Sequence, residues 1–218
     1  MNPWKRMAAE SAAAQVASGM TVGLGTGSTA AFVLEALGIR IRDGLRITGV
    51  PTSEATAARA RELGIPLALD VVTDIAIDGA DEVDPRTLNL IKGRGGALLR
   101  EKIVAQATRR FLVVVDETKL VFQLGAGLLP VEVAPFGWQA TARRLENLGA
   151  QLQRRDFVTD NGNYILDCAF GLMDNPESLA SQLDHIAGVV EHGLFIGLTA
   201  EVHVGKPSGA QILRQLPK

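Results

Sequence analysis

The sequence contains one cysteine, Cys168, and few features that could cross-link or anchor the chain. A single thiol excludes an internal disulfide framework and suits a reducing compartment such as the cytosol. No apolar stretch reaches the roughly 20 residues that a bilayer-spanning helix requires. The first residues, Met-Asn-Pro-Trp-Lys-Arg, carry their charges without an apolar run behind them, so we expect no signal peptide.

The sequence also lacks an excess of charge of either sign. Its formal net charge is -2 and no cluster of Lys and Arg stands out, so we expect no nucleic-acid-binding surface. Of the 218 residues, 47% are hydrophobic and 21% are charged, which is an ordinary globular composition. The length suits one large domain or two unequal ones. We expect a cytoplasmic globular protein that binds neither membranes nor nucleic acids.

Helical and strand-like segments alternate through the first half of the chain. Asn2 before Pro3 resembles an N-cap with proline at the first helical position, and predicts a helix to about Ala17. Continuous apolar runs bounded by helices indicate a mostly parallel sheet covered on both faces, so the predicted fold class is α/β with a doubly wound sheet. The other predicted helices end near Gly38 or lie at 53–63 and 96–109, and the predicted strands lie at 21–24, 45–50, 67–71, 75–78 and 111–115.

The pattern of elements changes after residue 127. Predicted strands at 129–134, 151–158, 164–169 and 189–198, with helices at 138–148 and 176–186, follow the order βαββαβ of a ferredoxin-like unit. Asn-Gly within 159–163 is a strong hairpin signal. We therefore expect a smaller α+β domain, residues 128–200, inserted into a Rossmann-like catalytic domain formed by residues 1–127 and 201–218. The tail is expected to return to the large domain as a helix beyond Pro207.

The first candidate site is the glycine-rich segment from Gly23 to Thr29. It follows a predicted strand and opens a helix, where free backbone N–H groups and the helix dipole favour an anion. The spacing is that of neither a P-loop nor a dinucleotide fingerprint. Hydroxyls beside glycine suit a single phosphate. A plain strand-to-helix turn capped by Ser28 is an equally good interpretation of this segment alone.

The second candidate is Asp78-Gly-Ala-Asp81-Glu-Val-Asp84. Carboxylates at the carboxyl end of a parallel strand point into the crevice where α/β proteins bind ligands. A calcium loop is the rival, but the glycine and the distal glutamate of an EF-hand are missing. We interpret Glu82 and Asp84 as a solvated acidic turn and favour function for Asp78 and Asp81.

The third candidate is Lys92-Gly-Arg-Gly-Gly96 followed by Glu101. Lys92 supplies a compact positive charge, which is useful where a carbonyl oxygen gains negative charge during a reaction. Glu101 falls early in the next predicted helix, where it could reach over the mouth of the loop or simply stabilise the helix. Arg100 and Lys102 are interpreted as solvated surface charges.

The remaining polar residues carry weaker signals. Lys119 follows a buried strand at the crevice end and could contact a ligand or sit on the surface. The three histidines, His185, His192 and His203, lack metal-ligand spacing, so we expect structural or solvated roles and no metal site. Cys168 is expected in the core.

Several of these motifs, taken in register, resemble ribose-5-phosphate isomerase of the A type. The resemblance covers essentially the whole chain. It implies interconversion of ribose 5-phosphate and ribulose 5-phosphate in the pentose phosphate pathway, without a metal or organic cofactor, in a homodimer or sometimes a tetramer. The motifs are Gly25-Thr-Gly-Ser-Thr-Ala30, Asp78-Gly-Ala-Asp-Glu82, Lys92-Gly-Arg-Gly-Gly-Ala-Leu98 with Arg100-Glu101-Lys102, and Asp116 with Lys119.

The resemblance also implies a role for each site residue. Glu101 matches the proton acceptor of the family, with Asp81 and Lys92 as further catalytic groups, Asp81 as a proton relay and Lys92 as the partner of the oxyanion. Arg94 stands where some members have glycine, and Lys5 aligns with a lysine thought to hold the phosphate. The implied substrate-binding residues are Lys5, Thr26, Gly27, Ser28, Thr29, Asp78, Gly79, Ala80, Asp81, Lys92, Gly93, Arg94, Gly95 and Lys119.

Two alternatives to the isomerase remain at this stage. One is a domain of related fold that senses phosphosugars without catalysis. Such regulators carry an attached helix-turn-helix, for which we expect no room before Thr21. The other is a different enzyme of the same general fold, such as an amino-sugar phosphate deaminase or an acyl-CoA transferase. The transferase would need a glutamate nucleophile in another setting, and the deaminase should need a histidine near its acids. All three histidines lie beyond residue 180.

Overall fold

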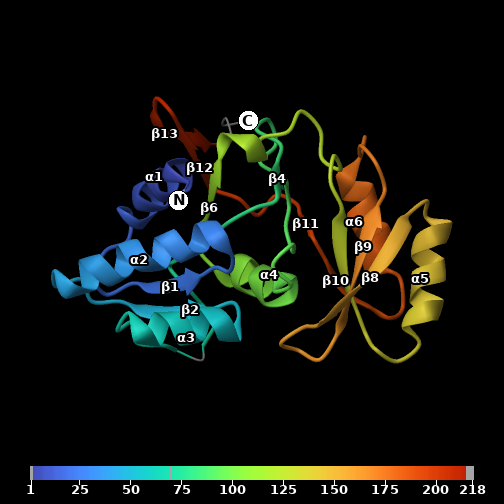
Figure 1. The fold of residues 1–218 in the computed structure, drawn as a ribbon, viewed down its shortest axis with the longest axis horizontal. Coiled ribbons are helices and arrows are strands. Elements are labelled where there is room, and N and C mark those ends of the chain that lie inside the picture. Colours follow the sequence, from blue (N-terminus) through green and yellow to red (C-terminus); the bar gives the residue numbers. More distant parts are fainter. Residues whose placement is uncertain (1, 69, 215–218) are drawn as a thin grey trace.

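The computed structural model describes residues 2–68 and 70–214, which form three sheets with helices packed around them (Figure 1). The largest sheet has six strands in the order β13-β12-β6-β3-β1-β2, all parallel except β13, which runs antiparallel to β12. This arrangement confirms the predicted α/β fold with a mostly parallel sheet. The strands are β1 (Thr21–Leu24), β2 (Thr48–Pro51), β3 (Ile75–Asp78), β6 (Phe111–Asp116), β12 (Glu201–Lys206) and β13 (Gly209–Arg214).

Helices cover both faces of this sheet because its central strands are apolar on both sides. Leu112 and Val114 of β6 pack into one buried cluster with α1 and α2, while Val113 and Val115 pack into another with α4. Asn2 caps α1, as predicted, although α1 ends at Ala13 rather than near residue 17. The helices are α1 (Pro3–Ala13), α2 (Ser28–Arg42), α3 (Glu54–Glu62) and α4 (Leu98–Ala107).

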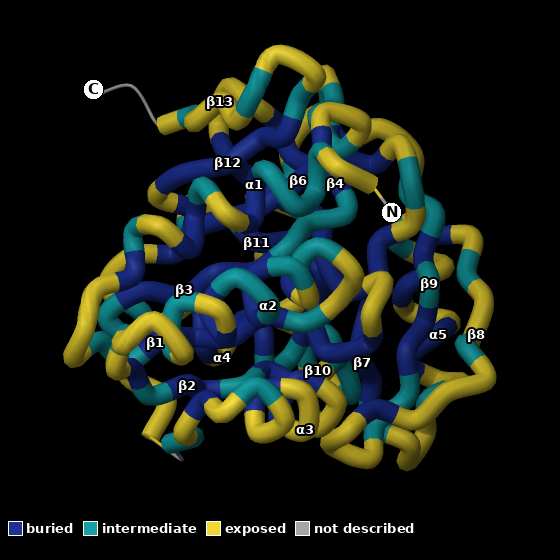
Figure 2. Tube along the Cα trace, turned by 60° about the vertical axis from the view of Figure 1, so that its left-hand side comes forward, coloured by how far each residue is buried: buried dark blue, intermediate teal, exposed yellow. Residues whose placement is uncertain are grey.

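The second sheet has four antiparallel strands in the order β10-β7-β9-β8. With its two helices it gives the predicted ferredoxin-like order βαββαβ. A third buried cluster is centred on this unit and also includes Ile91, Leu124 and Leu194 from outside it. Figure 2 shows buried residues along the central strands and exposed residues along β8 and β13, which are edge strands. The elements are β7 (Leu129–Val133), α5 (Trp138–Asn147), β8 (Gln151–Val158), β9 (Tyr164–Ala169), α6 (Pro176–Asp184) and β10 (Val189–His192).

A three-stranded sheet, in the order β11-β5-β4, lies between the two larger ones in the view of Figure 1. Its strands are β4 (Glu82–Val83), β5 (Leu90–Ile91) and β11 (Leu194–Phe195), and a short 3-10 helix, η1 (Glu117–Lys119), follows β6. Two-residue strands are too short to leave a periodic signal, which is why the sequence did not predict them. Because β11 pairs with β5, this sheet brings Lys92, which follows β5, beside residues 193–195 from much later in the chain.

Two predicted elements are wrong. The tail does return to the large sheet, but as the β12–β13 hairpin rather than a helix, because Val202 and Val204 complete the buried face beside β6. The predicted strand at 67–71 is reduced to a single bridge between Gly49 and Leu67. Residues 69 and 215–218 of these two predictions lie outside the described residues.

The predicted domain boundaries at 127/128 and 200/201 stay predictions. Among the described residues, no helix has both the length and the apolar character needed to cross a membrane.

Candidate active site

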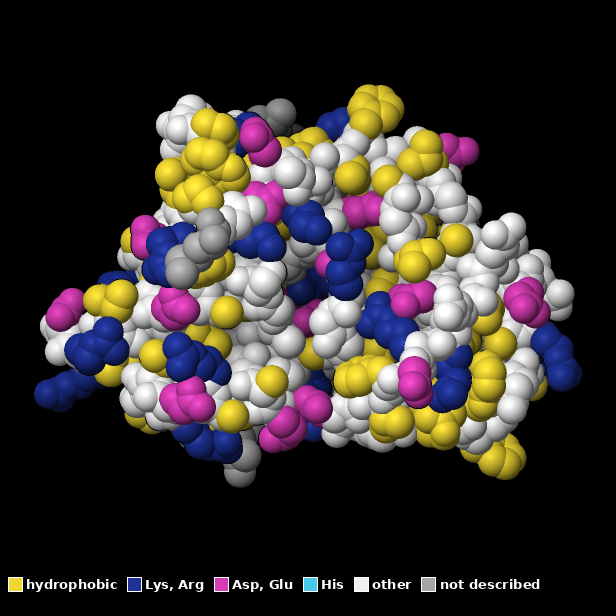
Figure 3. Space-filling model, viewed as in Figure 1, with side chains coloured by type: hydrophobic (Ala, Val, Ile, Leu, Met, Phe, Trp, Pro, Cys, Tyr) yellow, Lys and Arg dark blue, Asp and Glu magenta, His cyan; other side chains and the backbone are white. Residues whose placement is uncertain are grey.

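A pocket of about 280 Å³ opens where the carboxyl ends of β1 and β3 meet the loop after β5. Basic and acidic side chains gather around a hollow near the centre of the face shown in Figure 3. The predicted site residues come together in this pocket, with Asp78 buried beside it. The residues that line it are Lys5, Thr26, Gly27, Ser28, Thr29, Gly79, Ala80, Asp81, Lys92, Gly93, Arg94, Gly95, Glu101 and Lys119.

One end of the pocket is the loop from Gly25 to Thr29 at the start of α2. The helix begins at Ser28, so its N-terminal amides and dipole face this end. Lys5 Nζ, from α1, donates to Ser28 Oγ at 2.9 Å. The hydroxyl of Thr26 is already bonded to Thr52 Oγ1 at 2.8 Å, which fixes the loop from behind. A lysine, hydroxyls and helix amides together suit a phosphate group.

Asp78 joins the two loops that follow β1 and β3. Its Oδ1 accepts from the backbone N–H of Thr26 at 3.1 Å and of Gly79 at 2.7 Å, and its Oδ2 lies 3.0 Å from Lys92 Nζ. Burial raises the pKa of Asp78, and the charge of Lys92 opposes that rise. The packing is so close that a Cβ on Gly25 would lie 2.2 Å from Asp78 Oδ1. Only glycine is therefore tolerated at residue 25 without movement of this carboxylate.

The opposite wall of the pocket carries an ion pair between Lys92 and Glu101. Lys92 Nζ lies 3.2 Å from Glu101 Oε2 and donates to the carbonyl oxygen of Gly79 at 2.5 Å. Both side chains are 3% exposed. Burial, reinforced by the negative charge of Asp78, raises the pKa of Glu101 to about 8. The carboxylates of Asp78 and Glu101 raise the pKa of Lys92, against the effect of burial. A carboxyl group with a pKa near neutrality can both accept and return a proton.

Asp81 and Arg94 lie at the rim of the pocket. Asp81 Oδ2 accepts from the backbone N–H of Arg94 at 2.9 Å, and Asp81 Oδ1 lies 3.8 Å from Arg94 Nε. The side chain of Arg94 is 72% exposed, so its backbone is the part fixed at the site.

Arg155 of β8 contacts the site, although no local pattern in the sequence points to it. Its Nη1 donates to the carbonyl oxygens of Gly93 and Arg94, both at 3.0 Å. Its Nε and Nη2 each donate to the carboxylate of Asp167 at 2.6 Å. The predicted hairpin already placed strands 151–158 and 164–169 side by side, and that pairing is the signal that could have suggested an Arg155–Asp167 contact.

Three charges interpreted from the sequence as solvated are buried instead. Lys102 is 5% exposed, Glu82 6% and Asp84 7%. Glu82 accepts from the backbone N–H groups of Gly125 and Gly127, and Asp84 accepts from the guanidinium of Arg86. For Lys102 and Glu82 the surface prediction fails because their partners lie far along the chain. Asp84 is buried although its partner Arg86 lies only two residues further on.

Comparison with known proteins gives concordant matches. Residues 48–209 match the model of the family described as ribose 5-phosphate isomerase A (phosphoriboisomerase A). The ribose-5-phosphate isomerase A of Gluconobacter oxydans is 55% identical, over 97% of this chain and 96% of that protein. The protein of the same name from Gloeobacter violaceus is also 55% identical, over 96% of this chain and 95% of that protein.

Solved structures extend the match to three dimensions. Ribose 5-phosphate isomerase A from Methanocaldococcus jannaschii superposes with a TM-score of 0.94 at 42% identity, over 98% of this chain and 99% of that one. A D-ribose-5-phosphate isomerase in complex with phospho-erythronic acid has a TM-score of 0.94 at 40% identity, over 99% of this chain and 100% of that one. Sequence and structure agree over nearly the whole length, and the chain belongs to the ribose-5-phosphate isomerase A family.

Proposed function

We propose that this protein interconverts D-ribose 5-phosphate and D-ribulose 5-phosphate, the aldose–ketose isomerisation of the non-oxidative pentose phosphate pathway. The observation that carries the proposal is the buried carboxyl group of Glu101, 3.2 Å from Lys92, in a pocket whose other end suits a phosphate. Family membership supports it independently.

Glu101 is the proposed base. In the open-chain aldose it removes the proton from C2, which leaves an enediolate across C1 and C2. It then returns a proton to C1, so that C2 becomes the carbonyl carbon of the ketose. Its pKa of about 8 suits both steps, since the carboxylate is a stronger base than an ordinary glutamate and its acid form can donate near neutral pH.

Lys92 is the proposed electrostatic partner of the enediolate. A buried ammonium stabilises negative charge on the substrate oxygens more strongly than a solvated one, and the adjacent Gly93–Gly96 backbone adds N–H dipoles. Asp78 holds Lys92 and both substrate loops in register. Asp81, at the rim, would move protons between O1 and O2 or assist opening of the furanose ring.

The 5-phosphate is proposed to bind at the α2 end of the pocket. Ser28, Thr29 and Lys5 supply hydroxyl and ammonium donors there, and Lys119 lines the same pocket. Binding energy from this remote group would hold C1 and C2 beside Glu101 in a reactive position.

Neither alternative from the sequence, a phosphosugar sensor or another phosphosugar enzyme, is favoured by the comparisons. We further propose that the protein acts in the cytoplasm as a homodimer, with a tetramer as the alternative assembly, and that it needs no metal or organic cofactor.

The decisive experiment is incubation with ribose 5-phosphate in D₂O containing a chelator, followed by NMR. Ribulose 5-phosphate that carries deuterium from the solvent at C1 is the expected product. No conversion would overturn the isomerase and favour a binding protein. Calorimetry with phospho-erythronic acid, the ligand in the related complex, would then show whether the pocket still binds the sugar acid.

A further inference from the structure

Two consecutive charged residues in the first turn of α4 are both buried. Glu101 is 4% exposed and Lys102 5%. Neighbouring residues of a helix are about 100° apart around its axis, so the two side chains leave it in different directions. Glu101 reaches Lys92 in the pocket, whereas Lys102 reaches β10. Ala97, which precedes the helix, has no side-chain oxygen to cap it. The position of this turn therefore depends on its charged side chains and on packing.

Lys102 connects α4 to β10. Its Nζ donates to Glu191 Oε1 at 2.5 Å and to the backbone carbonyl oxygen of His192 at 2.7 Å, and lies 3.4 Å from His192 Nδ1. His192 Nε2 lies 3.1 Å from Asp184 Oδ1 at the end of α6. The ammonium is thus surrounded by oxygen and ring nitrogen atoms, which offset the cost of burying it.

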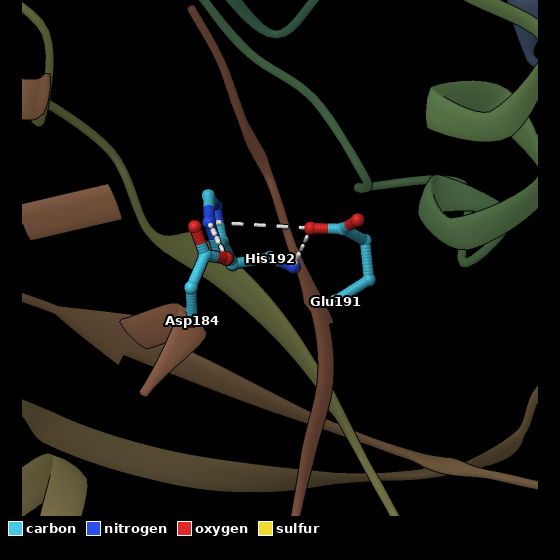
Figure 4. Close-up of side chains that lie close together, drawn as sticks. All are labelled: Asp184, Glu191 and His192. Atoms are coloured by element: carbon cyan, nitrogen blue, oxygen red, sulfur yellow. Dashed lines mark hydrogen bonds and ion pairs between the residues drawn. The ribbon is translucent and has the colours of Figure 1, made fainter. Parts of the chain in front are cut away.

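Glu191, His192 and Asp184 also satisfy the spacing of a metal site, because their ligand atoms lie within 4.8 Å of one another. Figure 4 shows these three side chains turned toward one another. The Lys102 ammonium already pairs with Glu191 and so supplies the positive charge that this cluster needs. We therefore interpret the cluster as the group that anchors Lys102, and not as a metal site.

The same segment supports the other catalytic side chain. The ring of Phe195 lies 5.5 Å from Lys92 Nζ and 5.1 Å from Lys102 Nζ, within the range of cation–π attraction. The backbone N–H of Lys92 donates to the carbonyl oxygen of Gly193 at 2.8 Å. A Cβ on Gly193 would lie 2.2 Å from the carbonyl oxygen of Lys92. Residues 191–195 therefore contact both Lys92, which precedes the Gly93–Gly96 loop, and Lys102, which follows Glu101.

We propose that Lys102 is a positioning residue of the isomerisation, which fixes the first turn of α4 on β10 so that Glu101 is held against Lys92 and the reacting carbons. The inference rests on the proposed function. It assigns to Lys102 no contact with the substrate. Its removal should therefore impair proton transfer and leave binding of the phosphosugar largely intact, since a displacement of about 1 Å in a reacting group can cost about a hundredfold in rate.

The test compares Lys102→Met with Arg100→Met in the full chain. Methionine keeps the length of the lysine stem and removes its charge. Arg100 is the matched control because it flanks Glu101 on the other side and is 32% exposed, and because its contacts with Glu54, Asn161 and Asp160 lie at the surface rather than in the interior. For each protein, kcat and KM for ribose 5-phosphate are measured, with the affinity for phospho-erythronic acid by calorimetry and the folded state by circular dichroism.

For Lys102→Met we expect kcat to fall by at least about tenfold, while KM and the affinity for phospho-erythronic acid stay within about twofold. Arg100→Met should keep kcat within about twofold, as expected for an exposed ion pair. A folded Lys102→Met protein with unchanged kcat overturns the inference, as does an equal loss in kcat and in affinity.

If Lys102→Met does not fold, Glu191→Gln serves as the test of the role of Lys102. Glutamine at residue 191 keeps an oxygen that can accept from the Lys102 ammonium, and the Glu191 side chain is 19% exposed. We therefore expect this variant to fold. Its kcat should fall by about threefold or more with unchanged KM, and an unchanged kcat overturns the inference. The wild-type protein is assayed first. If it converts no ribose 5-phosphate, the proposed function fails. If it does and the variants match it, only the role of Lys102 fails.

Discussion

Replacing Glu101 by glutamine should remove activity and stabilise the protein at the same time. Glutamine keeps the shape of the side chain and is neutral, so it resembles the protonated carboxyl group. It cannot accept the C2 proton, and kcat should fall by about 10²–10⁴-fold or more, the usual contribution of a general base. The fold and the affinity for phospho-erythronic acid should remain.

The gain in stability follows from the pKa of Glu101, which burial and Asp78 raise from 4.5 to about 8. Between these two values the folded protein holds a proton that the unfolded chain releases. The free energy of unfolding therefore falls as the pH rises through this window. At about 1.4 kcal/mol for each pKa unit, the full shift corresponds to about 5 kcal/mol as an upper bound. The glutamine variant avoids this loss.

The assay is urea unfolding of wild type and variant at pH 5, 7 and 9. The two proteins should be of similar stability at pH 5, and the variant should be more stable by about 2–5 kcal/mol at pH 9. Glu62→Gln is the control, because Glu62 is 63% exposed and its ion pair with Arg59 lies at the surface, where such pairs contribute little to stability. A Glu101→Gln protein that is no more stable than wild type at pH 9, or that keeps kcat, would refute the reasoning.

Three further changes test other parts of the pocket. Lys5→Met should raise KM for ribose 5-phosphate by about tenfold with little change in kcat, since it removes the proposed charge-assisted contact to the phosphate. Arg155→Lys should lower kcat by about tenfold with a small change in melting temperature, because lysine cannot hold both loop carbonyls and the Asp167 carboxylate. Gly25→Ala should destabilise the protein by about 1–3 kcal/mol in urea unfolding, because its Cβ would lie 2.2 Å from Asp78 Oδ1.

Each of these changes has its own counter-result. Lys206 of β12 does not line the pocket and bonds to Gln211, so Lys206→Met should leave KM unchanged. An equal rise in KM in both lysine variants would contradict a phosphate contact by Lys5. Arg154→Lys is the control for the arginine, because Arg154 lies over the rings of Trp138 and Tyr164 instead of the loop. An alanine at residue 25 with wild-type stability would show that Asp78 moves freely, backbone included, because the new Cβ would also lie 2.6 Å from the Cα of Asp78.

The sequence predicted the pocket well because its parts are local. Glycines, hydroxyls and carboxylates at the ends of β1 and β3 follow buried strands directly, and parallel strands place those ends together. The Lys92–Gly96 loop and Glu101 are likewise close in the sequence, and together they form one wall of the pocket. The roles of these residues in binding and catalysis stay predictions.

Most of the failures have one physical cause, which is contact between segments that lie far apart in the sequence. Lys102 looked like a solvated charge because its partners lie 89 and 90 residues further on. Arg155 carried no signal because it acts on backbone carbonyls 61 and 62 residues away. The tail was predicted as a helix because local propensity does not register that Val202 and Val204 complete a sheet face beside β6.

The packing of α1 on β12 has a consequence for synthesis of the chain. Trp4 and Gly205 are so close that a Cβ on Gly205 would lie 1.8 Å from the carbonyl oxygen of Trp4, and Ser11 Oγ lies 2.8 Å from His203 Nδ1. α1 leaves the ribosome first and β12 follows almost the whole length of the chain later. α1 also packs on α2 and β6, which are made early, whereas residues 191–195, which contact Lys92 and Lys102, are made almost as late as β12. Both ends of the pocket therefore depend on late segments, and the complete site should form only once the chain has been made through β12.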